Sequence, residues 1–221
     1  NSGLPTIIEK DIDVIIQDEH LKQKISATED YIKAIQETEI SIVAVGTPSG
    51  VNGHLDLSYI FNLAENFGQA LKQKHDFHII VIRSTILPGT VKRFTEIVET
   101  VSGKKSGSEF AVACNPEFLR EGSAVYDYFH PPFTLIGSNH QKSAEKIASL
   151  YKNIQSEVFI TDIEVAEIMK YINNTFHALK IAFANEIGNI CTAMHMDSHK
   201  VMEIFCNDRE LNISPYYLKP G

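Results

Sequence analysis

Residues 78–114, HIIVIRSTILPGTVKRFTEIVETVSGKKSGSEFAVAC, contain two apolar runs with a helical pattern between them. The runs His78–Arg83 and Phe110–Cys114 are short and consist mainly of β-branched or small apolar residues, which predicts buried strands. The loop STILPGT precedes a helix predicted from Val91 to about Val101, and SGKKSGSE forms the second loop. Strand, helix and strand in this order predict a βαβ unit with parallel strands.

The same alternation continues on both sides of this stretch. Further strands are predicted over Ile40–Val45, Phe133–Ile136 and Val158–Ile160, and further helices from Leu57 to about Lys72 and over Lys142–Lys152. Short apolar strands that alternate with helices predict an α/β fold with a mainly parallel sheet.

From Thr161 the pattern becomes helical for more than thirty residues, with no proline and a single glycine, Gly188. Thr161 and Glu164 have the spacing of a capping box, which predicts that the helix begins there. A second helix is predicted from Ser198 to about Cys206. A helix of this length typically links two domains or forms the spine of a dimer. The predicted domains are residues 1–160, a helical region at 161–208 and a segment at 209–221.

Composition limits the classes of protein to consider. Of the 221 residues, 43% are hydrophobic and 22% charged, as in ordinary globular proteins, and the net charge of −8 argues against nucleic-acid or anionic-membrane partners. No apolar run approaches the ~18 residues of a membrane span. Three cysteines without a CxxC pair indicate reduced thiols and a cytoplasmic protein. The chain begins without methionine and stops on YLKPG, so both ends are expected to be cuts.

Three loops that follow predicted strands contain small or hydroxyl residues, namely Gly46-Thr47-Pro48, Ser84-Thr85 and Asn115-Pro116-Glu117. Ligands bind at the carboxyl ends of the strands in an open parallel sheet, and such residues allow a close approach to the backbone. The alternative is that these are simply common loop residues. The chain has neither G-x-G-x-x-G nor G-x-x-x-x-G-K-[ST], and so contains no complete nucleotide-binding signature.

The stretch NPEFLREGSAV, residues 115–125, follows a buried strand with two carboxylates four residues apart. Asn115 as N-cap and Pro116 as first helical residue predict a helix with Glu117 and Glu121 on one face. This is either a well-capped surface helix or a pair of carboxylates in a cleft, one of which moves a proton.

A polar stripe is predicted on the long helix, because Lys170, Asn174, His177 and Asn185 fall within about 80° around its axis at ~100° per residue. A solvated helix face normally carries Glu and Lys, whereas Asn and His favour a stripe that lines a ligand site. No metal site is predicted, since His195 and His199 lack a third ligand. Cys114, within an apolar strand, is expected to be an inert buried thiol.

Five segments together resemble the UDP-glucose/GDP-mannose dehydrogenase family over essentially the whole chain. They are VGTPSGVNGHLDL (45–57), RSTILPGTV (83–91), NPEFLREGSAVYDY (115–128), EVAEIMKYINNTFHALKIAFANEIGNI (164–190) and LNISPYYLKPG (211–221). PEFLRE with a downstream AExxKYxxN is highly specific. The YYLKPG ending favours GDP-mannose over UDP-glucose as substrate.

The resemblance implies a partial Rossmann-like NAD domain, followed by a central helical region through which a homodimer forms. The family's G-x-G-x-x-G loop would precede Asn1, and its GGSCLPKD segment with the catalytic cysteine would follow Gly221. This chain alone is therefore expected to be inactive, with an exposed edge strand. The implied reaction is the oxidation of a nucleotide sugar at C6 from alcohol to acid with two NAD+, through a cysteine thioester.

The resemblance also assigns roles to single residues. Glu121 would be the base for thioester hydrolysis and contact both ligands, with Glu117 in support, while Lys170 and Asn174 would stabilise the oxyanion at C6. Thr85 would hold a water on the nicotinamide side, and Thr47 would lie near NAD. The remaining residues expected to contact the nucleotide sugar are His177, Asn185, Tyr216, Tyr217 and Lys219. Lys219 stands where GDP-mannose dehydrogenases tend to have arginine, and a lysine binds phosphate as a point charge where an arginine binds it as a fork.

Two alternatives stay open at this point. One is another NAD enzyme of the same plan, such as a β-hydroxyacid or 6-phosphogluconate-type dehydrogenase, although a single hydride transfer needs no pair like Glu117 and Glu121. The other is an inactive dimerisation or regulatory module.

Overall fold

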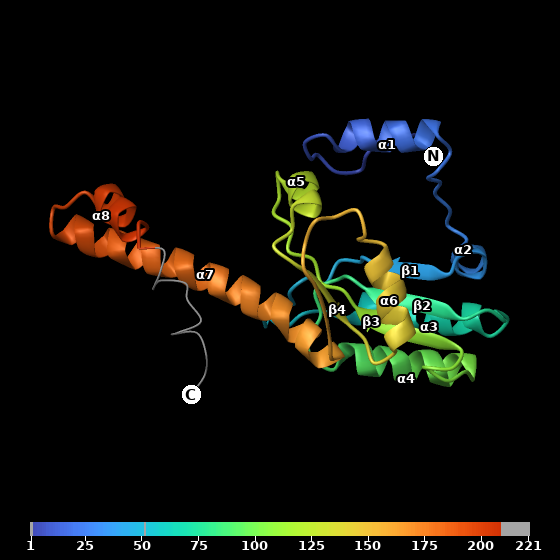
Figure 1. Cartoon of the computed structure of the whole chain (residues 1–221). Helices are drawn as coiled ribbons and strands as arrows, with labels where there is room; N and C mark the ends of the chain where they lie inside the picture. The colour runs from blue at the N-terminus through green and yellow to red at the C-terminus, as the bar shows by residue number, and fades with distance from the viewer. Residues whose placement is uncertain (1, 51, 209–221) are drawn as a thin grey trace. The chain divides into compact units, whose positions relative to one another are not determined.

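The computed structural model describes residues 2–50 and 52–208. It contains two compact units, Asn1–Tyr171 and Ile172–Gly221. The strands are β1 (Ile40–Val43), β2 (His78–Ile82), β3 (Phe110–Cys114), β4 (Thr134–Gly137) and β5 (Val158–Thr161). The helices that lie wholly in the first unit are α1 (Ile12–Leu21), α2 (Tyr31–Glu37), α3 (Ser58–Leu71), α4 (Thr90–Ser102), α5 (Ala124–Phe129) and α6 (Gln141–Ser149) (Figure 1).

The five strands form one sheet in the order β1-β2-β3-β4-β5. β1, β2 and β3 are parallel neighbours, as are β4 and β5, while β3 and β4 meet in antiparallel orientation through Cys114 and Gly137. The predicted α/β fold with a mainly parallel sheet is therefore confirmed. Because β1, β2 and β3 run the same way, the loops that follow them leave the same edge of the sheet.

The inner strands β2, β3 and β4 are mainly apolar because both faces of the sheet are covered there, whereas most of β5 is exposed. In β2, Ile80 and Ile82 point into a cluster with Phe67 of α3 and Phe94 of α4. The alternate residues Ile79 and Val81 point into a second cluster with Ile147 of α6. This burial on both faces explains why the strands read as continuous apolar runs and not as alternating ones.

The start of the long helix packs closely on the end of β4. α7 spans Ile163–Ala193 and begins in the first unit. A Cβ on Gly137 would lie 2.6 Å from the Cβ of Ala166 and 2.9 Å from the Cα of Ile163, so only glycine allows this approach. The predicted capping box is wrong, because Thr161 completes β5 and the residue before the helix is Asp162.

The second unit contains the rest of α7 and α8 (Ser198–Phe205). Phe183 of α7 and Phe205 of α8 lie with ring centroids 5.6 Å apart, and Cys191 is buried. Asp197 caps α8 by accepting hydrogen bonds from the backbone amides of His199 and Lys200. Across the described residues, no helix is both long and apolar enough to cross a membrane.

We expect the buried His78 to make stability depend on pH. Its Nδ1 lies 3.0 Å from the Thr38 carbonyl and its Nε2 3.0 Å from the Ser41 hydroxyl, and burial, with nearby Lys74, lowers its pKa from 6.5 to about 4. Between pH 6.5 and 4 the unfolded chain binds the proton and the folded chain does not, so stability falls as pH falls, by up to ~1.4 kcal/mol per pH unit. His78→Asn should reduce the fall in the thermal unfolding midpoint between pH 7 and pH 5.

The exposed His75 provides the control for this prediction. His75→Asn should keep the wild-type difference in unfolding midpoint between the two pH values. An equal difference in wild type and His78→Asn would show that His78 is not the group responsible.

Candidate functional site

Hydrogen bonds join the loops that follow β1, β2 and β3. The Thr47 hydroxyl donates to the carbonyl of Thr85 at 2.9 Å, and the Ser84 hydroxyl donates to the carbonyl of Val45 at 2.6 Å. Arg83 Nη1 donates to Asn115 Oδ1 at 2.9 Å. The three loops predicted to meet at the carboxyl edge of the sheet are therefore in contact.

Asn115 is a buried anchor of the third loop and not a helix cap. Its side chain is 2% exposed, its Nδ2 donates to the Leu135 carbonyl at 2.7 Å, and its Oδ1 accepts from Arg83 and Tyr151. Because the amide is fully engaged in this way, it cannot cap a helix. Residues 115–120 have no regular structure, and α5 begins only at Ala124. The predicted helix from Pro116, with two carboxylates on one face, is therefore wrong.

Lys170 of α7 reaches this third loop within the first unit. Its Nζ lies 2.8 Å from Glu117 Oε1 and donates to the Glu117 carbonyl at 2.6 Å, and it lies 5.6 Å from the centroid of the Phe118 ring. Lys170 is 9% exposed. The other carboxylate oxygen of Glu117 accepts from the amide of Leu119 at 2.6 Å. Glu117 thus serves as the counter-ion of a buried lysine.

An ammonium group has three N–H donors. Two of those of Lys170 are used on Glu117, so one donor and a positive charge remain for a third partner. A fixed cation with one free donor is suited to stabilising an oxygen that becomes negative during a reaction.

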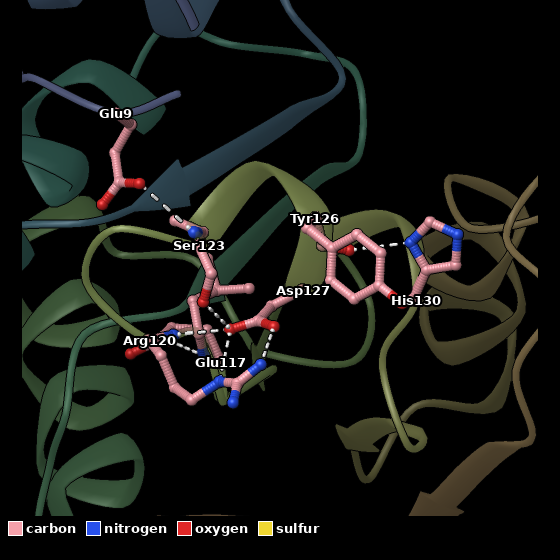
Figure 2. Close-up of polar contacts among 9 residues, drawn as sticks. Glu9, Glu117, Arg120, Ser123, Tyr126, Asp127 and His130 are labelled. Atoms are coloured by element: carbon pink, nitrogen blue, oxygen red, sulfur yellow. Dashed lines mark hydrogen bonds and ion pairs between the residues drawn. The ribbon is translucent and has the colours of Figure 1, made fainter. Parts of the chain in front are cut away.

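Glu121 lies in the turn that follows, with its neighbours held in place (Figure 2). Asp127 accepts from the Arg120 backbone amide at 3.0 Å, from its Nε at 3.0 Å and Nη2 at 2.6 Å, and from the Ser123 hydroxyl at 3.1 Å. The hydrogen bonds from Arg120 hold the pKa of Asp127 well below its usual range. Glu121 itself is exposed, and in the described part of the chain its carboxylate has no hydrogen-bond or ion-pair partner.

The other predicted site residues stand as follows. Asn174, His177 and Asn185 lie on α7 in the second unit and are exposed. Tyr216, Tyr217 and Lys219 lie outside the described residues. Burial raises the pKa of the Cys114 thiol to about 12, which keeps it protonated and unreactive, as predicted. In the described ranges no group of three or more His, Cys, Asp or Glu side chains could hold a metal.

The sequence reasoning missed Glu167, which is 1% exposed on α7. Its two carboxylate oxygens accept from the amides of Gly89 and Val91, both at 2.7 Å. Gly89 has no side chain with which to cap α4, so a residue 78 positions away supplies the cap. The only signal in the sequence was a glutamate one turn before Lys170.

A hollow of about 720 Å³ lies at the opposite edge of the sheet, where the strands begin, and is lined by residues that include Glu39, Lys74, Phe77 and His140. We do not assign it as the site, because ligands of open parallel sheets bind at the carboxyl ends. A cavity of about 40 Å³ lies at that end, beside Arg83, Asn115 and Glu117.

Part of a dinucleotide fits the residues at this edge. Gly46 has open space where a Cβ would stand, and no hydrogen bond in the described chain uses the Thr85 hydroxyl. The half-buried backbone at Gly46 and the free Thr85 hydroxyl suit the amide and ribose groups of a nicotinamide nucleotide. A glycine-rich loop for its pyrophosphate is not among the 221 residues.

Comparison with known proteins gives two family matches. Residues 1–155 match the model of the UDP-glucose/GDP-mannose dehydrogenase family, NAD binding domain, and residues 164–221 match that family's central domain.

Individual relatives agree with these matches. The GDP-mannose 6-dehydrogenase of Pseudomonas syringae pv. tomato is 44% identical over 222 residues, covering 100% of this chain and 51% of that protein. The UDP-glucose 6-dehydrogenase TuaD of Bacillus subtilis is 37% identical over 201 residues, covering 91% of this chain and 41% of that protein. A crystal structure of a ternary complex of GDP-mannose dehydrogenase from Pseudomonas aeruginosa has a TM-score of 0.97 at 41% identity, covering 99% of this chain and 50% of that chain. The chain spans about half the length of the curated relatives it matches.

Proposed function

Since the chain belongs to the UDP-glucose/GDP-mannose dehydrogenase family, we propose that the protein carrying it is an NAD-dependent nucleotide-sugar dehydrogenase that oxidises C6 of GDP-mannose to the acid. The observation that carries this proposal is the position of Lys170, whose cation lies on the Glu117 loop with one donor free. The 44% identity to a GDP-mannose 6-dehydrogenase supports GDP-mannose as the sugar nucleotide.

The proposed reaction has two oxidations and one hydrolysis. The C6 alcohol loses a hydride and a proton to give an aldehyde, and a cysteine thiol adds to it as a thiohemiacetal. Loss of a second hydride from carbon and of the proton of the thiohemiacetal hydroxyl gives a thioester, and water then releases the carboxylate and the thiol. NAD+, when bound, accepts one hydride in each oxidation. We propose that the nucleophilic cysteine lies outside these 221 residues. In support, Cys114 is buried and protonated and Cys191 is buried, which leaves only the exposed Cys206 at the end of α8.

Each residue of the site has a proposed task. Lys170, with Asn174 four residues later on α7, stabilises the negative oxygen at C6, and Glu117 holds Lys170 in place. Glu121, whose carboxylate is exposed, takes a proton from the water that attacks the thioester and lies near the cofactor. Thr47 and Thr85 hold the nicotinamide end of NAD. The proposed contacts to the nucleotide sugar are His177, Asn185, Tyr216, Tyr217 and Lys219.

The number of NADH formed per sugar tests this function in the full-length protein. We expect about two NADH per GDP-mannose, because the thioester route removes two hydrides, and little NADH from UDP-glucose. The matched control is the same protein with each sugar left out. Two NADH from UDP-glucose would keep the mechanism and change the substrate, an alternative supported by the 37% identity to TuaD. One NADH per sugar, or none, from both substrates would contradict the proposal.

We also propose that the protein is a cytoplasmic homodimer that pairs through α7. Apolar residues exposed on this helix, such as Leu179, Ile181 and Phe183, would be covered in such a dimer. The three free cysteines support a reducing compartment. A monomer in analytical ultracentrifugation, or recovery outside the cytoplasmic fraction, would contradict the respective part of this proposal.

A further inference from the structure

The amino-terminal arm, defined as residues 2–24, has few contacts with the rest of the first unit. Its helix α1 has no buried residue, and Leu4, Ile8 and Leu21 are exposed. Figure 1 shows α1 set apart from the sheet. Among the hydrogen bonds of the arm that the structure describes, only those of Glu9 reach another part of the chain.

Glu9 binds the turn that carries Glu121. One carboxylate oxygen accepts from the amide of Gly122 at 2.7 Å, and the other accepts from the amide of Ala124 at 3.3 Å. Figure 2 shows the Glu9 carboxylate pointing toward the backbone beside Ser123. Gly122 has a φ of +80°, a conformation that glycine adopts readily. A carboxylate that accepts two backbone amides fixes the orientation of the peptide units that contain them, and hydrogen bonds to a charged group are stronger than neutral ones.

Glu121 stands between two fixed points. On its amino side, Asp127 holds the backbone amide and guanidinium of Arg120. On its carboxyl side, Glu9 holds the amide of Gly122, which belongs to the peptide unit that begins at Glu121. The first fixed point is internal to residues 120–127, whereas the second comes from a segment more than a hundred residues earlier. Among the described residues, the arm is therefore the only element outside this loop that forms a hydrogen bond with the backbone beside Glu121.

We propose that Glu9 is a positioning residue, which fixes the backbone beside Glu121 and so sets the direction of its carboxylate for the hydrolytic step. The catalytic consequence of this inference rests on the proposed function. The tether, by which we mean the hydrogen bonds from the Gly122 and Ala124 amides to Glu9, does not. Glu9 touches no reacting atom in this scheme. Its effect is confined to the step that uses Glu121.

The tether is tested by hydrogen exchange in the full-length protein, on a peptide that contains residues 120–125. Glu9→Ala should make about two amides exchange roughly tenfold faster at short labelling times, because Gly122 and Ala124 lose their acceptor. Asp13→Ala is the matched control, since it removes an exposed carboxylate from the same arm and should leave that peptide unchanged. Glu9→Gln keeps one side-chain oxygen as acceptor and should give an intermediate result. Equal exchange in wild type and Glu9→Ala overturns the tether.

The positioning role is tested by rapid-mixing kinetics with saturating GDP-mannose and NAD+. Glu9→Ala should leave the rate of the first NADH burst unchanged and lower the steady-state rate about fivefold, because the hydrolysis is the step in which Glu121 moves a proton. A purely structural defect would lower both rates together and would overturn the role, as would an unchanged steady-state rate. If wild type forms no NADH from any nucleotide sugar, the proposed function and the positioning role both fall, while faster exchange still establishes the tether.

Discussion

Replacing Lys170 by methionine in the full-length protein should lower kcat for nucleotide-sugar oxidation by about a hundredfold or more. Methionine keeps most of the length of the side chain but removes the charge, and with it the cation–π contact with the Phe118 ring, as well as the free N–H donor. Removing one donor that stabilises a developing oxyanion costs about 10²–10³ in kcat in well-studied enzymes. The variant also leaves the Glu117 carboxylate without its cation, which adds to the loss. The measurement is the initial rate of NADH formation at saturating substrate.

Lys180→Met is the control, because Lys180 is an exposed lysine on the same helix and stacks over the Phe176 ring. It should retain wild-type kcat within about twofold. A similar KM for NAD+ in Lys170→Met and wild type would show that the NAD domain is still folded. A kcat for Lys170→Met within a few fold of wild type would exclude Lys170 from the chemical step and remove the main support for the proposed mechanism.

The inner strands of the sheet could be predicted from the sequence because they are covered on both faces. A short apolar run such as Phe110–Cys114 between two helical patterns predicts a buried strand. The strand has the predicted bounds. The short helices α1, α2 and α5 were not predicted. α1 has no buried residue and α2 has one, so neither shows the apolar periodicity on which a prediction depends. α5 has only six residues.

The site was predicted in part. The three loops and Lys170 do come together, because the carboxyl ends of parallel strands share an edge and the start of α7 packs on β4 at Gly137. The conformation of the third loop was not predictable from local rules. Asn115 followed by proline is a favoured helix start, but its amide is taken by Leu135, Arg83 and Tyr151, contacts between residues distant in sequence. Glu9 and Glu167 were missed for the same reason.

Glu167 should have the largest effect on stability of any single residue in the site. It accepts two backbone amides at 2.7 Å while almost fully buried, and these bonds tie α7 to the loop between β2 and α4. Burial raises the pKa of this carboxyl, against the amides of Val91 and Gly89, which favour the ionised form. We expect Glu167→Ala to lower the free energy of unfolding by about 3 kcal/mol, because it leaves two amides without an acceptor at ~1–3 kcal/mol each. The measurement is the thermal unfolding midpoint of the full-length protein with and without NAD+.

Glu164→Ala is the matched control, since Glu164 is an exposed glutamate one turn earlier on the same helix. It should cost less than about 1 kcal/mol, the usual size of a charge effect in the first turn. Because Glu167 holds the loop that carries Thr85 and lies one turn before Lys170, its loss should also weaken NAD+ binding. A difference in unfolding midpoint between Glu167→Ala and Glu164→Ala that is present both with and without NAD+ would show that Glu167 stabilises the fold itself. Equal unfolding midpoints for the two variants would show that water replaces the carboxylate at the Gly89 and Val91 amides, and that the packing at Gly137 is enough to hold α7.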